Sequence, residues 1–290
     1  MSEDFVPVEQ DPEIRALLAR ALAEDIGSGD ATTLALVDAQ SKARASIVAR
    51  HPIVLSGVRL AGEVFRMVDP GLEIEFLHSD GNPVKAGAAV LRGEGLARAL
   101  LTAERTSLNL LQRMTGIATA TARVVGIVSE YGTLILDTRK TVPGLRRLDK
   151  YAVKCGGGTN HRLGLHDAIL IKDNHLAFWR QKHRGTLADA VRRAHEAYPD
   201  LKIEIEVDTL DQLKEVLPGQ PDWVLLDNMS PTMVAKAVAI CDGACKTEAS
   251  GGITEDNVRE YARAGVTAIS IGALTHSAPA ADLSLEFESR

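Results

Sequence analysis

Six short runs decide the fold of this chain: TLILD (133–137), AILIK (168–172), KIEIEV (202–207), WVLLD (223–227), KTEAS (246–250) and TAISIG (267–272). They have the length and composition of buried strands, and helical patterns separate them. Their starts lie about 20 to 35 residues apart, the spacing of βα units in a parallel structure. Six or seven such strands are too few for a closed eight-stranded barrel. We therefore expect an α/β fold with an incomplete barrel, and a doubly wound sheet is the alternative.

The residues that precede these runs have another pattern. Asp11 and Pro12 suit the cap and first turn of an amphipathic helix that ends near Gly27. A small α+β unit follows, with a helix over 59–67, and its expected strands are ARASIVAR (43–50), PIVLSG (52–57), LEIEFL (72–77) and AAVLRG (88–93). A long helix is then expected from residue 96 to about 131, with a break at Gly116 as the alternative.

This change of pattern predicts two domains. Residues 1–115 would form the N-terminal α+β domain and residues 116–275 the barrel domain. The tail, 276–290, would pack with the N-terminal domain, although its sequence DLSLEFESR by itself indicates only a solvated end.

Composition excludes several classes of protein. The 290 residues are 45% hydrophobic and 25% charged, which is enough to bury a large core. The net charge of -6 argues against nonspecific nucleic-acid binding, which needs a basic face. No apolar run approaches the roughly 20 residues that span a bilayer, and the start is acidic, so we expect a cytoplasmic protein. The three cysteines, Cys155, Cys241 and Cys245, are expected to be thiols and not a disulfide framework.

Polar residues recur directly after the predicted strands. A single one is commonly a helix cap, but the repetition over six strands predicts an active site, because ligands of parallel α/β folds bind at the carboxyl ends of the strands. The residues in question are Asp137 to Lys140, Lys172, Asp173, Glu206, Asp208, Asp227, Asn228, Glu248, Ser250 and Gly272.

Two glycine-containing loops at this edge suggest phosphate binding. Ser250-Gly251-Gly252-Ile253-Thr254 precedes a helix expected to begin near Glu255, and Ile271-Gly272-Ala273 follows the last strand. Backbone N–H groups in such loops hold phosphate in many barrels, and a plain tight turn is the alternative for the first loop.

Positive charge is concentrated between residues 138 and 172. Arg146, Arg147, Lys150 and Lys154 are expected to form a solvated face of a helix. Arg139 and Arg162 are different, because each guanidinium can hold a carboxylate through two parallel N–H bonds, and two such groups suit a dicarboxylate. The glycines of Cys155-Gly156-Gly157-Gly158-Thr159-Asn160-His161-Arg162 permit close approach of a ligand. His161, His166 and His175 have no partners at a recognisable zinc spacing, so no zinc site is expected.

The sequence resembles that of the quinolinate phosphoribosyltransferases. The resemblance is carried by DTRKTVPGLR (137–146) and KYAVKCGGGTNHRLGLHDAILIKDNH (150–175), and more loosely by AERTSLNLLQRMTGIAT (103–119), EIEVDTL, LLDNM, EASGGI and ISIGALTHS. It covers nearly the whole chain. It implies an α/β sandwich plus an incomplete barrel, and a homodimer in which each active site takes residues from the partner's small domain.

The resemblance also implies roles for particular residues. Thr138, Arg139, His161, Arg162 and Lys172 would surround quinolinate, with Arg105 coming from the other subunit. Lys140, Glu206 and Asp227 would face phosphoribosyl pyrophosphate and Mg²⁺. The 5′-phosphate would lie against Ser250, Gly251, Gly252, Ile271, Gly272 and Ala273. Lys140, Lys172, Glu206 and Asp227 would be the catalytic group, and Glu206 and Asp227 the metal ligands.

The implied function is decarboxylating phosphoribosyl transfer to quinolinate, which makes nicotinate mononucleotide for NAD synthesis. A phosphoribosyltransferase for nicotinate or another pyridine monocarboxylate is the nearest alternative, but it needs to recognise only one carboxylate. A phosphosugar aldolase or isomerase would share the phosphate loop and leave the two arginines unexplained. A regulator that binds a metabolite without turnover is the alternative outside the enzymes.

Overall fold

The structure is a computed structural model and describes residues 11–182 and 185–288. The chain divides into two compact units, each described here by itself. The first comprises Met1–Ala120, Val142–Gly157 and Ala278–Arg290, and the second Thr121–Thr141 and Gly158–Ser277. The expected boundaries at residues 115 and 275 did not anticipate that 142–157 would join the first unit.

The first unit is built on an antiparallel sheet with the strand order β12-β1-β5-β3. Its strands are β1 (Lys42–Ala49), β3 (Glu73–Phe76), β5 (Ala89–Leu96) and β12 (Leu283–Phe287). Along the second half of β1 buried and half-buried side chains alternate, as expected where one face of a strand meets the core. The C-terminal segment pairs with β1 from Ala45 to Ala49, so it is a strand of the sheet and more than a solvated end. Two residues of β2 (Ile53–Val54) pair separately with β4 (Pro83–Val84).

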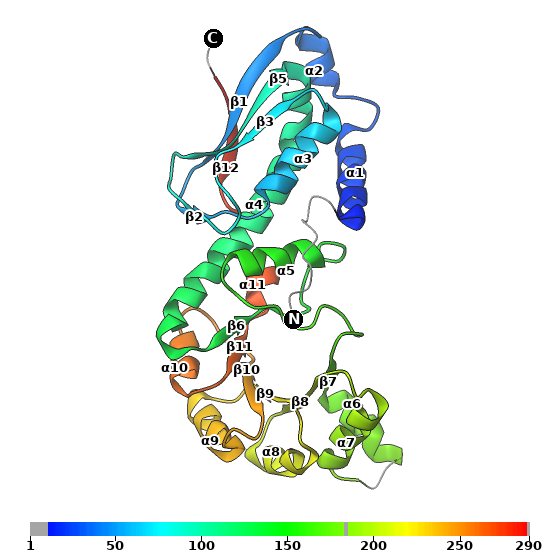
Figure 1. Cartoon of the computed structure of the whole chain (residues 1–290), viewed down its shortest axis with the longest axis vertical. Helices are drawn as coiled ribbons and strands as arrows, with labels where there is room; N and C mark the ends of the chain where they lie inside the picture. The colour runs from blue at the N-terminus through cyan, green and yellow to red at the C-terminus, as the bar shows by residue number, and fades with distance from the viewer. Residues whose placement is uncertain (1–10, 183–184, 289–290) are drawn as a thin grey trace. The chain divides into compact units, whose positions relative to one another are not determined.

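The helices of this unit are α1 (Pro12–Ile26), α2 (Ala31–Leu36), α3 (Val58–Val68), α4 (Ala97–Val128) and α5 (Arg146–Cys155). Of these, α1, α3 and α4 lie on one side of the sheet (Figure 1). The predicted cap is confirmed, because the Asp11 carboxylate accepts a hydrogen bond from the Glu13 N–H. Leu148, Ala152 and Val153 of α5 lie in the same hydrophobic core as α3 and α4, which explains why this segment belongs to the first unit.

Helix α4 continues through Gly116 without a break. A Cβ atom on Gly116 would lie 2.1 Å from the Pro279 carbonyl oxygen, so the glycine permits residues 278–280 to pack directly on the helix. The basic residues of α5 were expected to form a solvated face. This expectation is wrong for Lys150, which is buried. Arg147 forms ion pairs with Asp11 and Glu13.

The second unit contains the predicted parallel strands. They are β6 (Leu134–Leu136), β7 (Ile169–Ile171), β8 (Ile203–Val207), β9 (Trp223–Asp227), β10 (Lys246–Ser250) and β11 (Ala268–Ser270). Within the described residues they form one sheet in the order β6-β11-β10-β9-β8-β7, with parallel pairing between neighbours. Strands β6 and β7 are its two edges. The incomplete barrel is thereby confirmed with six strands.

Helices alternate with these strands and lie along the outside of the curved sheet (Figure 1). They are α6 (Asp173–Lys182), α7 (Leu187–Ala197), α8 (Leu210–Val216), α9 (Pro231–Cys241), α10 (Val258–Arg263) and α11 (Ala273–His276). Thr186, Thr209 and Ser230 cap α7, α8 and α9 through their hydroxyl groups. Short 3₁₀ turns, Ser129–Tyr131 and Leu217–Gly219, precede β6 and β9.

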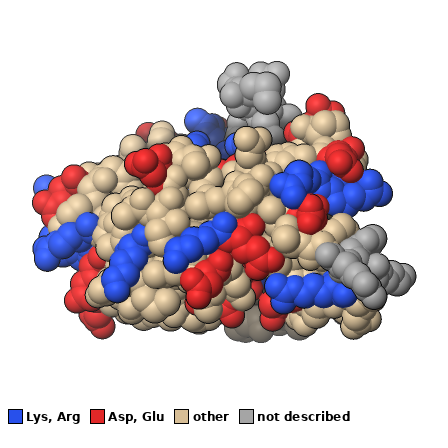
Figure 2. Space-filling view, turned by 90° about the horizontal axis from the view of Figure 1, so that it is seen from below, with Lys and Arg blue, Asp and Glu red and all other residues tan. Residues whose placement is uncertain are grey.

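Charged side chains of both signs lie on the face of the molecule that Figure 2 shows. On the face in Figure 2, Lys and Arg side chains are interspersed with Asp and Glu, so no continuous basic field covers it. Among residues 11–182 and 185–288, no helix combines the length and the apolar character needed to cross a bilayer.

Candidate active site

The carboxyl ends of β7 and β8 bring two predicted catalytic residues together. Lys172 follows β7, and its Nζ lies 2.5 Å from Oε2 of Glu206 on β8. The pairing of Ile171 with Ile205 places these strand ends side by side. The lysine side chain is 45% exposed and that of Glu206 is 15% exposed, so the pair joins a solvent-facing cation to a largely covered carboxylate.

The ends of β9 and β10 are joined through Asn228. Its side-chain amide donates to Oδ2 of Asp227 at 2.5 Å, and its backbone N–H donates to the Ser250 carbonyl at 2.9 Å. Asn228 has a φ of 54°, and a Cβ on Gly251 would lie 2.2 Å from its Oδ1 atom. Because Gly251 itself has a φ of 95°, both the space and the backbone conformation require glycine there. The predicted residues Asp227, Ser250 and Gly251 are therefore neighbours.

The first glycine loop differs from its prediction at the helix. Helix α10 begins at Val258 and not near Glu255. Between them the Asn257 side chain accepts from the Thr254 N–H at 2.8 Å and donates to the Gly252 carbonyl at 3.1 Å. The loop is thus held by a side chain, and Gly252, with a φ of 62°, remains exposed.

The second glycine loop lies against Lys140. The Thr275 hydroxyl donates to the Lys140 carbonyl at 2.9 Å, and a Cβ on Gly272 would lie 2.9 Å from Cδ of the lysine side chain. Ile271 is buried beneath the loop, and Ala273 is exposed as the first residue of α11. The chain therefore brings a lysine from the end of β6 to the loop that follows β11, the next strand in the sheet.

Arg139 and Arg162 influence each other electrostatically. Burial, and then the positive charge of Arg139, lower the pKa of Arg162. Arg162 donates from Nη1 to the Ala168 carbonyl at 3.1 Å. Nε of Arg139 is buried and has no hydrogen-bond partner among the described atoms. Thr138 precedes it, and its hydroxyl accepts the Lys140 N–H at 3.0 Å. These two neighbouring guanidinium groups, one of which has a buried N–H donor without a partner, form a site that can bind an anion.

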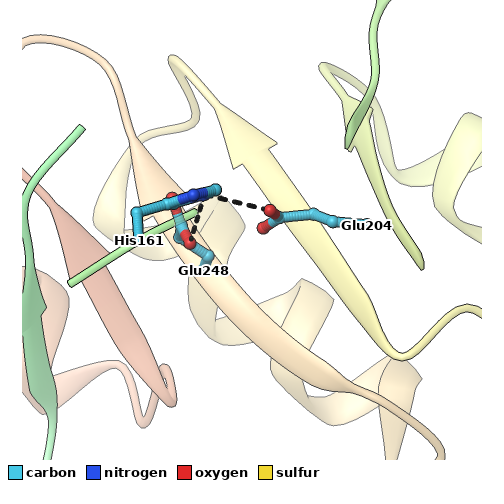
Figure 3. A group of neighbouring side chains, drawn as sticks. All are labelled: His161, Glu204 and Glu248. Atoms are coloured by element: carbon cyan, nitrogen blue, oxygen red, sulfur yellow. Dashed lines mark ion pairs between the residues drawn. The ribbon is translucent and has the colours of Figure 1, made fainter. Parts of the chain in front are cut away.

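His161 lies in a buried group with two glutamates (Figure 3). Its Nε2 atom is 3.1 Å from Oε2 of Glu204 on β8 and 3.6 Å from Oε2 of Glu248 on β10. Its backbone N–H donates to the buried Asp137 carboxylate at 2.8 Å. Burial, and then the charge of Glu204, raise the pKa of Glu248 to about 8.

Glu204 was not selected from the sequence. The sequence nevertheless contains a pattern that indicates it, because the alternation in KIEIEV puts Glu204 on the same face of the strand as the predicted site residue Glu206. A glutamate in the middle of a strand with buried neighbours requires a partner.

Arg105 belongs to the other unit. It lies on α4 with its side chain 59% exposed, and its nearest acidic atom is Oε1 of Glu104 at 3.8 Å. The remaining predicted site residues belong to the second unit, whereas this arginine is on a solvent-facing part of the first.

The fold and the site together define an incomplete parallel α/β barrel with cations, carboxylates and glycine loops gathered at one edge of its sheet. Two family models match the chain: the C-terminal domain of quinolinate phosphoribosyl transferase over residues 117–286, and the N-terminal domain over residues 30–115.

Known relatives agree with these models. The nicotinate-nucleotide pyrophosphorylase [carboxylating] of Mycobacterium leprae is 44% identical over 94% of this chain and 96% of its own. A probable enzyme of that name from Bacillus subtilis is 39% identical over 94% of this chain and 93% of its own. The solved structure of the nicotinate-nucleotide pyrophosphorylase from Francisella tularensis superposes with a TM-score of 0.90 at 38% identity, covering 98% of this chain and 99% of that one. The chain belongs to the quinolinate phosphoribosyl transferase family, as the resemblance indicated.

Proposed function

We propose that this protein transfers the phosphoribosyl group of phosphoribosyl pyrophosphate to quinolinate with loss of CO₂, yielding nicotinate mononucleotide and pyrophosphate in de novo NAD synthesis. The activities for which the relatives are named support the reaction class: besides those above, a quinolinate phosphoribosyltransferase [decarboxylating] of Nicotiana tabacum is 35% identical over 97% of this chain. The observation that carries the substrate assignment is the pair Arg139 and Arg162. Quinolinate carries two carboxylates, so it can occupy both guanidiniums.

The acidic residues at the strand ends fit Mg²⁺. Glu206 and Asp227 lie at the carboxyl ends of the neighbouring strands β8 and β9, and carboxylate oxygens are ligands that Mg²⁺ accepts while keeping waters and substrate phosphates. When bound, the ion would neutralise charge on the pyrophosphate. Glu206 is held by Lys172 and Asp227 by Asn228, so both carboxylates are oriented before any ligand arrives.

The side chains would act by charge and position. Lys140 and Lys172 would stabilise the negative charge that grows on the pyrophosphate as it leaves the ribose carbon. Glu206 and Asp227 would orient the ribose and stabilise its cationic centre. The glycine loops would hold the 5′-phosphate through the backbone near Ser250, Gly251, Gly252, Ile271, Gly272 and Ala273.

The decarboxylation follows from the product of the transfer. The pyridine nitrogen bonds to the ribose carbon and becomes cationic. The bond to the adjacent carboxylate then breaks, CO₂ leaves, and the electron pair remains on a ring carbon that the cationic nitrogen stabilises until a proton arrives. This chemistry requires no nucleophilic side chain, so a Schiff base at Lys172 is not part of the proposal.

The deciding assay supplies purified protein with quinolinate, phosphoribosyl pyrophosphate and Mg²⁺ and measures CO₂, pyrophosphate and nicotinate mononucleotide together. Equal amounts of the three products are expected. Nicotinate is tested in parallel, because product from nicotinate without CO₂ would support the monocarboxylate enzyme instead. Folded protein with no turnover on either substrate would contradict the proposal and favour a binding protein.

The proposal includes a homodimer in which Arg105 completes the partner's site. Its exposure is compatible with this role. Arg105→Ala and Lys140→Ala subunits, each inactive alone, should regain activity when mixed, since a hybrid dimer contains one site with both residues intact. Subunit exchange without recovery would contradict a site completed in trans.

A further inference from the structure

The group formed by His161, Glu204 and Glu248 is not explained by the proposed reaction. Glu204 lies two residues before Glu206 on the same face of β8, deeper in the sheet. Glu248 comes from β10, two strands away, and its side chain is only 2% exposed. Figure 3 shows the imidazole directed at both carboxyl groups. Oε1 of each glutamate is buried with no hydrogen-bond partner in the described part of the chain.

Both nitrogens of the imidazole already have partners in the protein. The Arg162 backbone N–H donates to Nδ1 of His161 at 2.7 Å, so Nδ1 carries a lone pair. The proton of the ring is therefore on Nε2, which faces the two glutamates. Neither nitrogen is left to bind a substrate carboxylate directly.

The same arrangement argues against a metal ion. One nitrogen and two carboxylate oxygens, all within 4.8 Å of one another, resemble a set of metal ligands. A metal-bound histidine, however, normally donates a hydrogen bond from its other nitrogen, whereas Nδ1 here accepts one. Nε2 would also have to lose its proton. The nearby positive charge of Arg162, which interacts with Glu204, opposes a divalent cation as well.

We infer that Glu204 and Glu248 are positioning residues that hold Arg162 for a substrate carboxylate, with His161 as the connecting link. The inference rests on the proposed function. The connection runs from the two carboxyl groups to Nε2, through the ring, and from Nδ1 to the Arg162 backbone. The His161 backbone is fixed from the other side by Asp137. Glu204 also acts on the Arg162 guanidinium through its charge. Glu204 therefore affects both the position of Arg162, through His161, and its electrostatic environment.

The protonation of the two glutamates is compatible with this role. Burial and the neighbouring Glu204 raise the pKa of Glu248 to about 8, which favours the neutral form of this carboxyl group at pH 7. The charge of Glu204 acts on Glu248 and on the Arg162 guanidinium. A buried group with one negative charge avoids the cost of two adjacent carboxylates.

The test uses the full-length protein and four variants. Glu204→Gln removes the charge, Glu248→Leu removes the carboxyl group 3.6 Å from Nε2 of His161, and Glu248→Gln keeps a polar group of the same shape. Thr247→Val is the matched control, because Thr247 is a buried polar residue on the same strand that bonds to Thr267 and not to His161. Each is measured for the KM of both substrates, for kcat and for thermal stability, and Glu204→Gln is also combined with His161→Ala.

Glu204→Gln and Glu248→Leu should raise the KM for quinolinate by about tenfold to a hundredfold, since misplacing a binding group by about 1 Å has effects of that size. The KM for phosphoribosyl pyrophosphate should change little, Glu248→Gln should restore most of the loss, and Thr247→Val should leave both KM values unchanged. Glu204→Gln should add little to His161→Ala, because both interrupt one connection. Unchanged quinolinate KM in folded variants, or fully additive effects, would overturn the inference.

Two further measurements separate this inference from the proposed function. Nitrogen NMR of ¹⁵N-histidine-labelled protein without substrate should show His161 protonated at Nε2 and unprotonated at Nδ1, whatever the enzyme does. The opposite tautomer, or a stoichiometric metal ion that Glu248→Leu protein lacks, would overturn the inference. Wild-type protein that shows this tautomer but no turnover would contradict the proposed function alone.

Discussion

Replacing Arg139 with methionine should make the protein more stable and less active at once. Nε of Arg139 is buried without a partner among the described atoms, and the charge of Arg139 opposes that of Arg162. A buried unpaired donor costs about 1 to 3 kcal/mol, and methionine removes it while keeping most of the apolar stem. The free energy of unfolding without substrate should therefore rise by about 1 to 3 kcal/mol.

Activity should move in the opposite direction. The loss of a charged two-bond contact to a carboxylate is expected to cost about 2 to 4 kcal/mol of transition-state stabilisation, or roughly 30-fold to 1,000-fold in kcat/KM for quinolinate. Arg193→Met is the control, because Arg193 is an exposed residue of α7 that pairs with Glu196 at 3.5 Å. It should change neither quantity appreciably.

Urea unfolding of the two variants measures the change in the free energy of unfolding, and steady-state kinetics measures the change in kcat/KM for quinolinate. A loss of stability in Arg139→Met relative to Arg193→Met would show that the buried donor is satisfied in the folded protein, and the reasoning would be wrong. Unchanged quinolinate kinetics would remove Arg139 from the site.

Three other predictions concern stability. Asp149→Asn should cost about 3 to 5 kcal/mol, because the fully buried Asp149 carboxylate accepts two bonds from Arg113, at 2.9 and 2.8 Å, and the substitution removes the negative charge that the guanidinium faces; a loss below 1 kcal/mol by chemical unfolding would refute this. Gly251→Ala should destabilise the protein more than Gly243→Ala in the same assay, since both glycines have positive φ but a Cβ would meet other atoms only at Gly251. For Glu248, whose pKa is raised from 4.5 to about 8, the folded protein binds the proton more tightly, so its contribution to stability is present below pH 4.5 and is lost as the pH rises through 8. Glu248→Gln should flatten the decline of unfolding free energy over this range, and equal slopes in both proteins would contradict that expectation.

The sequence predicted the elements whose signals are local. The runs ending at Asp227 and Ser250 became neighbouring strands, because a short apolar run between helical segments has few alternatives in a parallel fold. The cap at Asp11 was predicted for the same reason, since a capping carboxylate acts within its own turn.

The missed features depend on contacts between distant residues. The assignment of α5 to the first unit depends on the core that its apolar side chains enter, and the unbroken α4 depends on the Pro279 carbonyl above Gly116. Glu204 was overlooked because its partner His161 is far from it in sequence and lies outside the strands. The roles of the individual site residues stay predictions until the variants are measured.

The pairing of β12 with β1 affects how the protein can be made. A ribosome synthesises β12 only after the entire second unit, so a nascent chain carries β1 with one edge unpaired for most of its synthesis. Such an edge can recruit a strand from another chain, which is a common start of aggregation. The ion pairs of Arg44 and Arg92 on β1 and β5 place charge across this sheet, where it discourages a foreign apolar strand. Expression yield should thus respond to changes in residues 283–287, although these lie outside the unit that carries most of the candidate active site.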